Sequence, residues 1–382
     1  MKNLTVVTSV FISIKIYYQS PPEIIWGRQF GTDKEEYCMI HVNDGKGNIY
    51  VCGKTTGSLT GKNLGKNDGF ITKMDASGNV IWTRQFGTSE DENVLWSAID
   101  CHGCVYITGS TTGDMEGKNS GKEDIFIVKY NPDGQLLWEK QFGTDSTDVG
   151  NGIYAGNQGF VYLTGITRGK LGDLSFGSAD GFMMKLDSSG KKIFVDQFGT
   201  PADDFSSAIT CDNSSIYICG STWGNLAAKN NGLIDIITGQ FTTEGKLVRF
   251  NQLGSEGFDF AMNLAVDKDK NLYLCGSTSG NFGGEQIGDG DCFLTKVSNK
   301  GEILWNRQFG TKNHDGSRGI LIEKGTTDRL LISGLQNLPP AKSFVRMYSQ
   351  DGDLLWEKII CGKHNEDASG KDISIDRDGN IY

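Results

Sequence analysis

Acidic side chains recur at one fixed place along this chain, and a regular column of carboxylates could bind a cation or serve acid–base chemistry. Each lies five residues after a glycine that closes a segment resembling WTRQFGT. The column consists of Glu36, Glu92, Asp148, Asp204, Asp259, Asp315 and Asp367. If the repeats close around an axis, the column should form a ring at the mouth of a central channel.

Two interpretations of this ring stay open. In the first, each carboxylate accepts backbone N–H bonds and fastens the turn of its own repeat. In the second, the ring binds a cation. One carboxylate per repeat around a wide channel is a poor cage for calcium, which needs several converging oxygen ligands. We therefore prefer the turn interpretation and expect no metal site and no cofactor.

Other residue types that could contact a ligand stand in the loops. A second acidic column opens a later strand of each repeat, at Asp68, Asp124, Asp180, Asp235 and Asp291, and is expected to fasten a glycine-rich loop. Arg168 and Trp223 break the pattern, because other copies hold Thr56, Thr112 and Ser279 there. A cation beside an exposed aromatic could hold a sugar or a peptide, so both are candidate ligand contacts, against ordinary surface variation.

The elements that must position these side chains follow from an internal repeat of about 56 residues, which indicates one stacked supersecondary unit. In the copy from 36 to 87, four β-branched or aromatic runs are separated by Gly, Asn and Asp clusters, which is the pattern of strands and turns. With 52 Gly and only 6 Pro, the glycines mark turns in ordered structure. The recurrent tryptophans, Trp82 and Trp138 among them, are expected to be largely buried between neighbouring units rather than to stack on sugars.

These observations predict an all-β fold, a seven-bladed β-propeller with four antiparallel strands per blade. The last blade should be built from both termini, because a free sheet edge would otherwise stay unpaired, and the end at Tyr382 falls in mid-strand as in a truncated chain. The propeller is assigned to residues 23–382. Residues 1–22 are either a signal peptide or, through residues 11–17, a degenerate propeller strand.

Three strand motifs resemble the SBBP family of β-propeller repeats, common in bacterial secreted and surface proteins. They are G-N-x-Y-x-x-G at 47–53, D-x-F-x-x-K at 68–73 and W-x-R-Q-F-G-T at 82–88. In the sixth copy Lys342 replaces the Asp of the second motif. The resemblance implies the fold and a secreted or cell-surface location, with a cytoplasmic one left open. It implies no particular reaction.

Charge narrows the classes of partner. A net charge of -10 with pI near 5.0 disfavours nucleic acid and anionic membranes, and no run of 18 apolar residues suggests a membrane span. The four histidines are scattered, and spacing assigns no Ser-His-Asp set. We expect a monomeric, non-enzymatic binding or scaffold module that takes a protein or carbohydrate ligand on its long-loop face. The alternative is a carbohydrate-active, glycosidase-like enzyme that uses the acidic ring.

Overall fold

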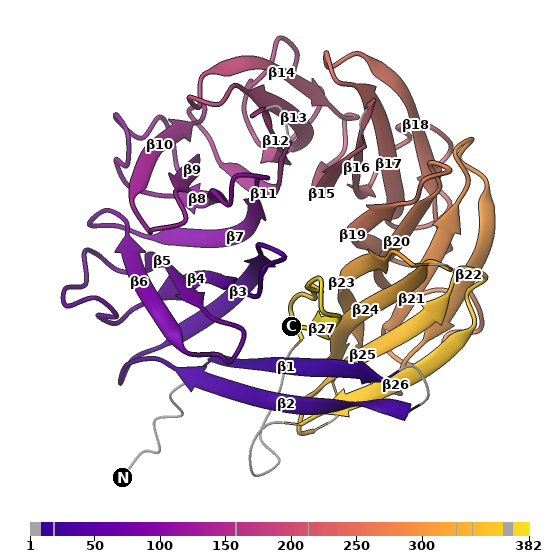
Figure 1. Cartoon of the computed structure of the whole chain (residues 1–382). Coiled ribbons are helices and arrows are strands. Elements are labelled where there is room, and N and C mark those ends of the chain that lie inside the picture. The colour runs from indigo at the N-terminus through magenta and orange to yellow at the C-terminus, as the bar shows by residue number, and fades with distance from the viewer. Residues whose placement is uncertain are drawn as a thin grey trace.

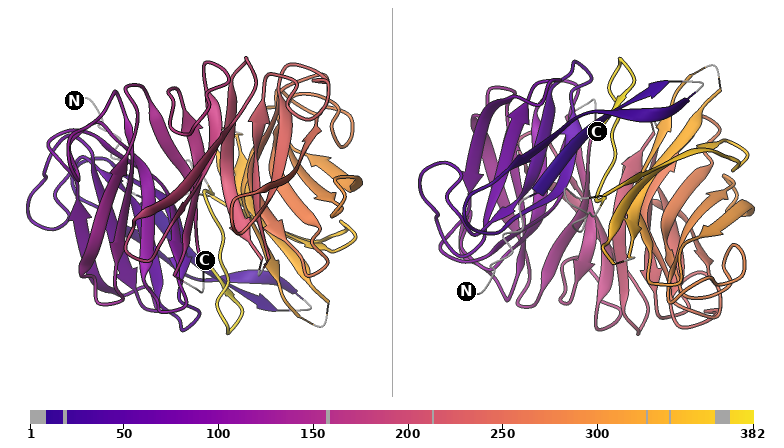
Figure 2. Two further views of the ribbon diagram at one scale, coloured as in Figure 1. Left: turned by 90° about the horizontal axis from the view of Figure 1, so that it is seen from above. Right: turned by 90° about the horizontal axis from the view of Figure 1, so that it is seen from below.

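Sheets stand side by side around a central axis in a computed structural model of the chain (Figure 1). The structure describes residues 9–17, 20–156, 159–212, 214–325, 327–337, 339–361 and 370–382, with side chains from Pro22 onward and that of Ser13. Within these ranges the strands form six four-stranded antiparallel sheets and one three-stranded sheet. Seen from above and below, the sheets stand around the ring with their loops at its two faces (Figure 2).

The six four-stranded sheets, or blades 1 to 6, follow one another along the chain. Blade 1 is β3 (Glu36–Asn43), β4 (Ile49–Thr55), β5 (Asp68–Met74) and β6 (Val80–Phe86); blade 2 is β7 (Glu92–Ile99), β8 (Val105–Thr111), β9 (Asp124–Tyr130) and β10 (Leu136–Phe142); blade 3 is β11 (Asp148–Ala155), β12 (Val161–Thr167), β13 (Asp180–Leu186) and β14 (Lys192–Phe198). Blade 4 is β15 (Asp204–Cys211), β16 (Ser215–Thr222), β17 (Asp235–Thr242) and β18 (Leu247–Leu253); blade 5 is β19 (Asp259–Val266), β20 (Leu272–Thr278), β21 (Asp291–Val297) and β22 (Ile303–Phe309); blade 6 is β23 (Gly316–Glu323), β24 (Arg329–Gln336), β25 (Lys342–Ser349) and β26 (Leu354–Ile360).

The expectation of seven four-stranded blades is wrong, since six are complete in the described chain. The remaining sheet joins both ends of the chain in the order β2 (Ser20–Phe30), β1 (Ser9–Tyr17), β27 (Asn380–Ile381). The strand that would complete this sheet beside β27 is reduced to one bridge between Ile375 and Ile381. Backbone hydrogen bonds between Ser374 and Tyr382 lie next to that bridge. β1 and β2 run between blade 1 and blade 6 (Figure 1).

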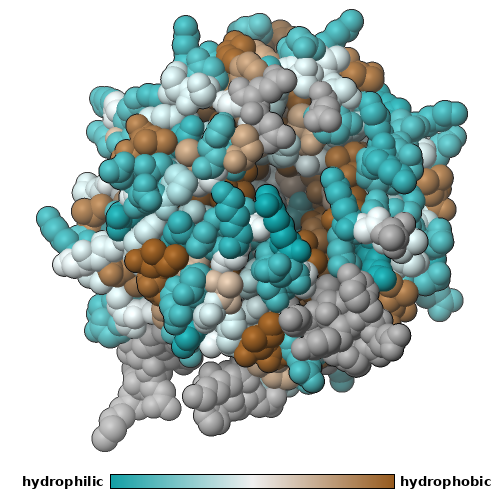
Figure 3. Space-filling view, in the orientation of Figure 1, coloured by the Kyte–Doolittle hydropathy of each residue, from teal (hydrophilic) through white to brown (hydrophobic). Residues whose placement is uncertain are grey.

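The core lies between blades, because the second and third strands of each blade are covered on both faces. β4 and β5 are buried at six of their seven positions, and β8 and β9 at all seven. The fourth strands form the outer edge and begin with exposed residues, such as Val80 and Ile81. On the face that Figure 3 shows, apolar residues stand in small separate groups on a mainly hydrophilic surface. The described chain contains no helix that is long and apolar enough to cross a membrane.

Candidate ligand-binding site

The acidic residues at the start of the first strands do not line an open channel. The six that the structure describes are fully buried, and Asp367 lies outside the described residues. Glu92 accepts hydrogen bonds from Thr88 N and Thr88 Oγ1, both at 2.8 Å, and from Thr111 Oγ1 at 2.8 Å. Asp259 accepts the equivalent three bonds from Ser255 and Thr278. These contacts are those of the turn interpretation, because each carboxylate accepts the backbone N–H of the residue four positions earlier; the position at an open channel mouth is corrected, since all six are buried.

Burial also shifts the pKa of four of these carboxylates. It raises the pKa of Glu92, Asp148, Asp204 and Asp259 above the ordinary values of their side chains, against the opposing effect of the hydrogen bonds. The third-strand aspartate of the preceding blade adds to the rise by charge repulsion, as Asp68 does for Glu92. The contacts are those of a turn that is fastened from inside the blade.

The second acidic column fastens the long loops. Asp68 Oδ2 accepts from Leu64 N at 2.7 Å and from Gln85 Nε2 at 2.6 Å. Gln85 in turn binds the loop at both ends of its amide, donating to Gly57 O and accepting from Leu59 N. The same arrangement surrounds Asp124, Asp180, Asp235 and Asp291. One fourth-strand glutamine in each of blades 1 to 5 thus links the fourth strand, the third strand and the loop: Gln85, Gln141, Gln197, Gln252 and Gln308.

The recurrent tryptophans join neighbouring blades, and they are half-buried rather than largely buried as expected. Trp82 Nε1 donates to Pro132 O in the next blade at 3.2 Å, and its ring lies against Gly134. Gly134 has φ +77, and a Cβ there would meet the indole at 2.9 Å, so the turn needs glycine for both reasons. Trp138 makes the equivalent bond to Ser188 O at 3.1 Å.

The structure brings Trp223 into a group of four aromatic side chains, here called the aromatic platform, made of Phe205, Trp223, Phe258 and Phe260. Phe205 and Phe260 are stacked with ring centroids 6.2 Å apart and planes at 21°. Phe258 stacks on Phe260 at 6.4 Å and 7°, and Trp223 lies 5.4 Å from Phe205. Trp223 and Phe258 remain 40% and 42% exposed, so the platform offers ring surface to solvent across blades 4 and 5.

Arg168 stands beside the platform on blade 3. Its guanidinium Nη2 lies 3.7 Å from Asp203 Oδ2, with the two side chains 45% and 36% exposed. The backbone carbonyl oxygen of Asp203 also accepts a hydrogen bond from the backbone N–H of Trp223 at 3.0 Å. The structure therefore connects the two residues selected from the sequence through Asp203. An ion pair this exposed and this long is weak, so the guanidinium stays available to a ligand anion.

The other platform residues could have been found from the sequence by their position next to the first-strand acid, but they were not predicted. Phe205 and Phe260 directly follow the buried acid of the first strand, where other blades carry Asn93 or Val149, and Phe258 directly precedes it. Aromatic residues at these flanking positions occur on two consecutive repeats. Only the closure of the ring shows that they meet Trp223.

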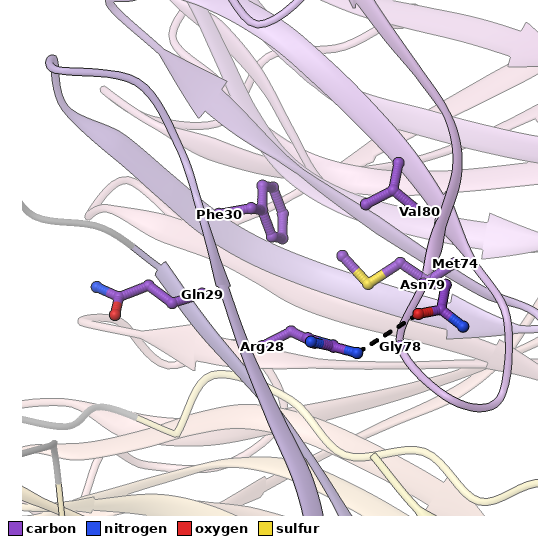
Figure 4. A pocket seen from close by; sticks show the side chains of 7 residues that line it. All are labelled: Arg28, Gln29, Phe30, Met74, Gly78, Asn79 and Val80. Atoms are coloured by element: carbon purple, nitrogen blue, oxygen red, sulfur yellow. Dashed lines mark hydrogen bonds between the residues drawn. The ribbon is translucent and has the colours of Figure 1, made fainter.

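A cavity of about 280 Å³ lies elsewhere, where β2 meets the turn between β5 and β6 (Figure 4). It is lined by Arg28, Gln29, Phe30, Met74, Gly78, Asn79 and Val80. Arg28 Nη2 donates to Asn79 Oδ1 at 3.4 Å, and Trp26 and Arg28 both lie against Gly78. Arg84 makes the matching contact with the next blade through Gly134 O. The cavity thus belongs to the contact between neighbouring blades.

Three polar residues that the sequence did not connect also meet. His41 Nε2 lies 2.8 Å from Ser374 Oγ, and His41 Nδ1 lies 3.5 Å from Asp372 Oδ2. They are 333 and 331 residues apart in sequence, so spacing could not indicate the contact. Among the described residues, no group of three or more His, Cys, Asp and Glu side chains could hold a metal ion.

Comparison with known structures supports the fold. A polysaccharide lyase, PL25 ulvan lyase, matches with a TM-score of 0.51, and its structure bound to -[GlcA(1-4)Rha3S]- matches with a TM-score of 0.50. Both matches have 14% sequence identity and cover 84% of this chain and 83% of the lyase chain. This chain is a β-propeller. At that identity the likeness shows the fold alone.

Sequence comparison adds little about function. The regulatory protein FlaEY of Caulobacter vibrioides (strain ATCC 19089 / CIP 103742 / CB 15) is 23% identical over an alignment of 242 residues, and the match covers 56% of this chain and 24% of that protein. The propeller thus spans about a quarter of that relative's length. No family model matches the chain, so the SBBP resemblance rests on the repeat motifs alone.

Proposed function

We propose that the long-loop face of this propeller is a binding surface that holds a glycan chain without converting it, through the aromatic platform and Arg168. The observation that carries the proposal is the exposure of Trp223 and Phe258 at the two ends of a stacked aromatic group. A sugar ring has an apolar C–H face and a polar hydroxyl edge, and it matches an aromatic face bordered by polar groups.

Arg168 narrows the class of glycan. A guanidinium is a planar, permanently charged donor that suits carboxylate or sulfate groups. The saccharide named with the ulvan lyase, GlcA-Rha3S, is acidic, and it supports the idea that a propeller can hold such a chain. We therefore favour an acidic glycan, and a secreted or cell-surface location is proposed on the same grounds.

The enzymatic alternative used the acidic ring, and the geometry gives it no support. A glycosidase needs two carboxyl groups that face the scissile bond. In the described part of the chain the ring carboxylates are fully buried and hydrogen-bonded inside their blades. Substrate could reach them only if the turns opened.

A glycan array probed with the purified chain tests the proposal. We expect retention on acidic glycans, weakened at least about tenfold by Trp223→Ala combined with Phe258→Ala. Tyr37→Ala is the matched control, because Tyr37 occupies in blade 1 the position of Phe205 and lies outside the platform. No retention on any glycan, or equal retention by the double variant, would refute the proposed function. A chain that binds no glycan but captures a protein in a separate pull-down experiment would have a protein ligand instead.

A further inference from the structure

His41, Asp372 and Ser374 form a polar cluster where blade 1 meets the closing segment of the chain. His41 lies on β3 and is 6% exposed, and the Asp372 side chain is 12% exposed. Ser374 keeps part of its surface exposed. The distances, 2.8 Å from Ser374 Oγ to His41 Nε2 and 3.5 Å from His41 Nδ1 to Asp372 Oδ2, order the three groups as hydroxyl, imidazole and carboxylate.

This cluster departs from the repeat. His41 pairs with Val51 on β4, and the residues in the same register on blades 3 to 6 are apolar: Ile153, Ile209, Leu264 and Ile320. Blade contacts of this kind form without polar groups; Ile153 packs with Ala98 and Trp96, for example. Burying an imidazole and a carboxylate costs free energy unless they are paired. Closure of the ring therefore does not require these three residue types.

Protonation agrees with this order of groups. Burial lowers the pKa of His41, so the imidazole is neutral near pH 7 and can accept a proton. Burial raises the pKa of Asp372, and the charge of His41 acts in the opposite direction. The tautomer that carries its hydrogen on Nδ1 leaves Nε2 to accept the hydrogen of the Ser374 hydroxyl, and the backbone of Tyr382 also hydrogen-bonds to the imidazole. A distance of 3.5 Å is long, as catalytic hydrogen bonds often are before substrate binds.

Positive charge lies close to this cluster. Lys371 precedes Asp372, and its pKa is lowered by burial and by the nearby charge of Arg318. Arg318 is the bulged residue of β23, between Ser317 and Gly319. Gly319 in turn lies against Ile373 of the closing segment. The two cations thus lie where the closing segment packs against β23.

We propose that Ser374 is the nucleophile of a second, esterase-type activity, with His41 as general base and Asp372 as the residue that positions it. Ser374 Oγ attacks the carbonyl carbon of a carboxylic ester while His41 Nε2 takes the hydroxyl proton. The carbon–oxygen bond to the alcohol then breaks, and the leaving alkoxide takes that proton from His41. Water deprotonated by His41 attacks the acyl-serine, which releases the carboxylic acid and restores the Ser374 hydroxyl.

A fluorophosphonate probe on the full chain tests this activity, because such probes phosphonylate activated serines. We expect an adduct on Ser374, located by peptide mass, in the native protein and not in the urea-denatured protein. His41→Gln should slow labelling by about 100-fold or more. Thr210→Ala is the control: Thr210 pairs with Tyr217 on blade 4 as Ser374 pairs with Tyr382, and on the next blade Leu264 stands where His41 does.

Asp372 needs a separate readout, since it acts through His41. The labelling rate of the native protein should rise with pH, with a midpoint below 6.5, and Asp372→Asn should shift that midpoint as well as lower the rate. Hydrolysis of p-nitrophenyl acetate should follow the same order of variants. The proposal is overturned if native Ser374 is no more reactive than in urea, or if His41→Gln labels at the native rate.

Discussion

Blade 2 and blade 4 share one set of buried contacts but present different surfaces on the long-loop face. In both blades a fourth-strand glutamine binds the third-strand aspartate, Gln141 to Asp124 at 3.0 Å and Gln252 to Asp235 at 2.9 Å. Outside this network, blade 2 has Thr112 where blade 4 has Trp223. The repeated residues thus maintain the fold, and the residues that differ between repeats are those a ligand would meet.

The long loops show the same contrast. Those of blades 3 to 5 expose Leu174, Phe176, Leu233 and Ile287, and blade 1 exposes Leu64. The loop of blade 2 has instead Lys118 and Lys122 among glycines and polar residues. Because exposed apolar groups that cluster on one side mark interaction surfaces, the face over blades 3 to 5 is the side where we place ligand binding.

The largest effect is expected where the buried network is broken. Glu92→Ala leaves three donors on Thr88 and Thr111 without an acceptor, and should lower the free energy of unfolding by about 3–4 kcal/mol. Glu90→Ala, an exposed neighbour paired with Lys66, should change it by no more than about 0.5 kcal/mol. Denaturant unfolding of both variants measures this, and equal losses would remove the distinction between network and surface.

An intermediate effect is expected at Arg168. Arg168→Ala should weaken binding of an acidic glycan by about five- to tenfold, or about 1 kcal/mol, because one exposed charge-assisted contact is lost. Unfolding should hardly change. Lys170→Ala, an exposed cation in the same loop, is the control and should leave affinity unchanged. If the two variants weaken binding equally, net charge rather than a guanidinium site attracts the glycan.

The smallest effect concerns pH. The pKa of Glu92 is raised in the folded protein, first by burial, so the folded state holds this proton more tightly than the unfolded chain. Its contribution to stability is full below the ordinary value of 4.5 and is lost as pH rises through the folded pKa. The stability of the native chain relative to Glu92→Gln should therefore fall as the pH rises above 4.5. A rise over that range would contradict the assigned direction.

Much of the architecture could be predicted because each repeat carries its own strand and turn residues. The repeat predicted four strands per blade and a sheet built from both ends. It overestimated the number of complete blades, since it could not show that, in the described part of the chain, the first strand of the divided repeat is reduced to a bridge at Ile375 and backbone bonds at Ser374. The position of Glu92 was also predictable, but its direction was not, because a side chain at the opening of a strand can turn into the blade or toward the axis.

Ligand-facing groups were predictable only in part. Arg168 and Trp223 stood out as departures from the repeat, and Asp203 connects them. Phe258 and Phe260 needed the three-dimensional arrangement of blades 4 and 5. His41 and Ser374 meet only because the ring closes, which no local pattern encodes.

Two tryptophans provide the most direct test of the separation between fold and ligand surface. Trp82→Ala removes a half-buried ring that bonds the next blade, and should cost about 2–3 kcal/mol of stability while glycan affinity stays unchanged. Trp223→Ala should cost less than about 1 kcal/mol and weaken glycan binding at least about tenfold. Unfolding and glycan binding measured on both variants should give opposite orders. The account is contradicted if Trp223→Ala destabilises the protein as much as Trp82→Ala does, or if it leaves binding intact.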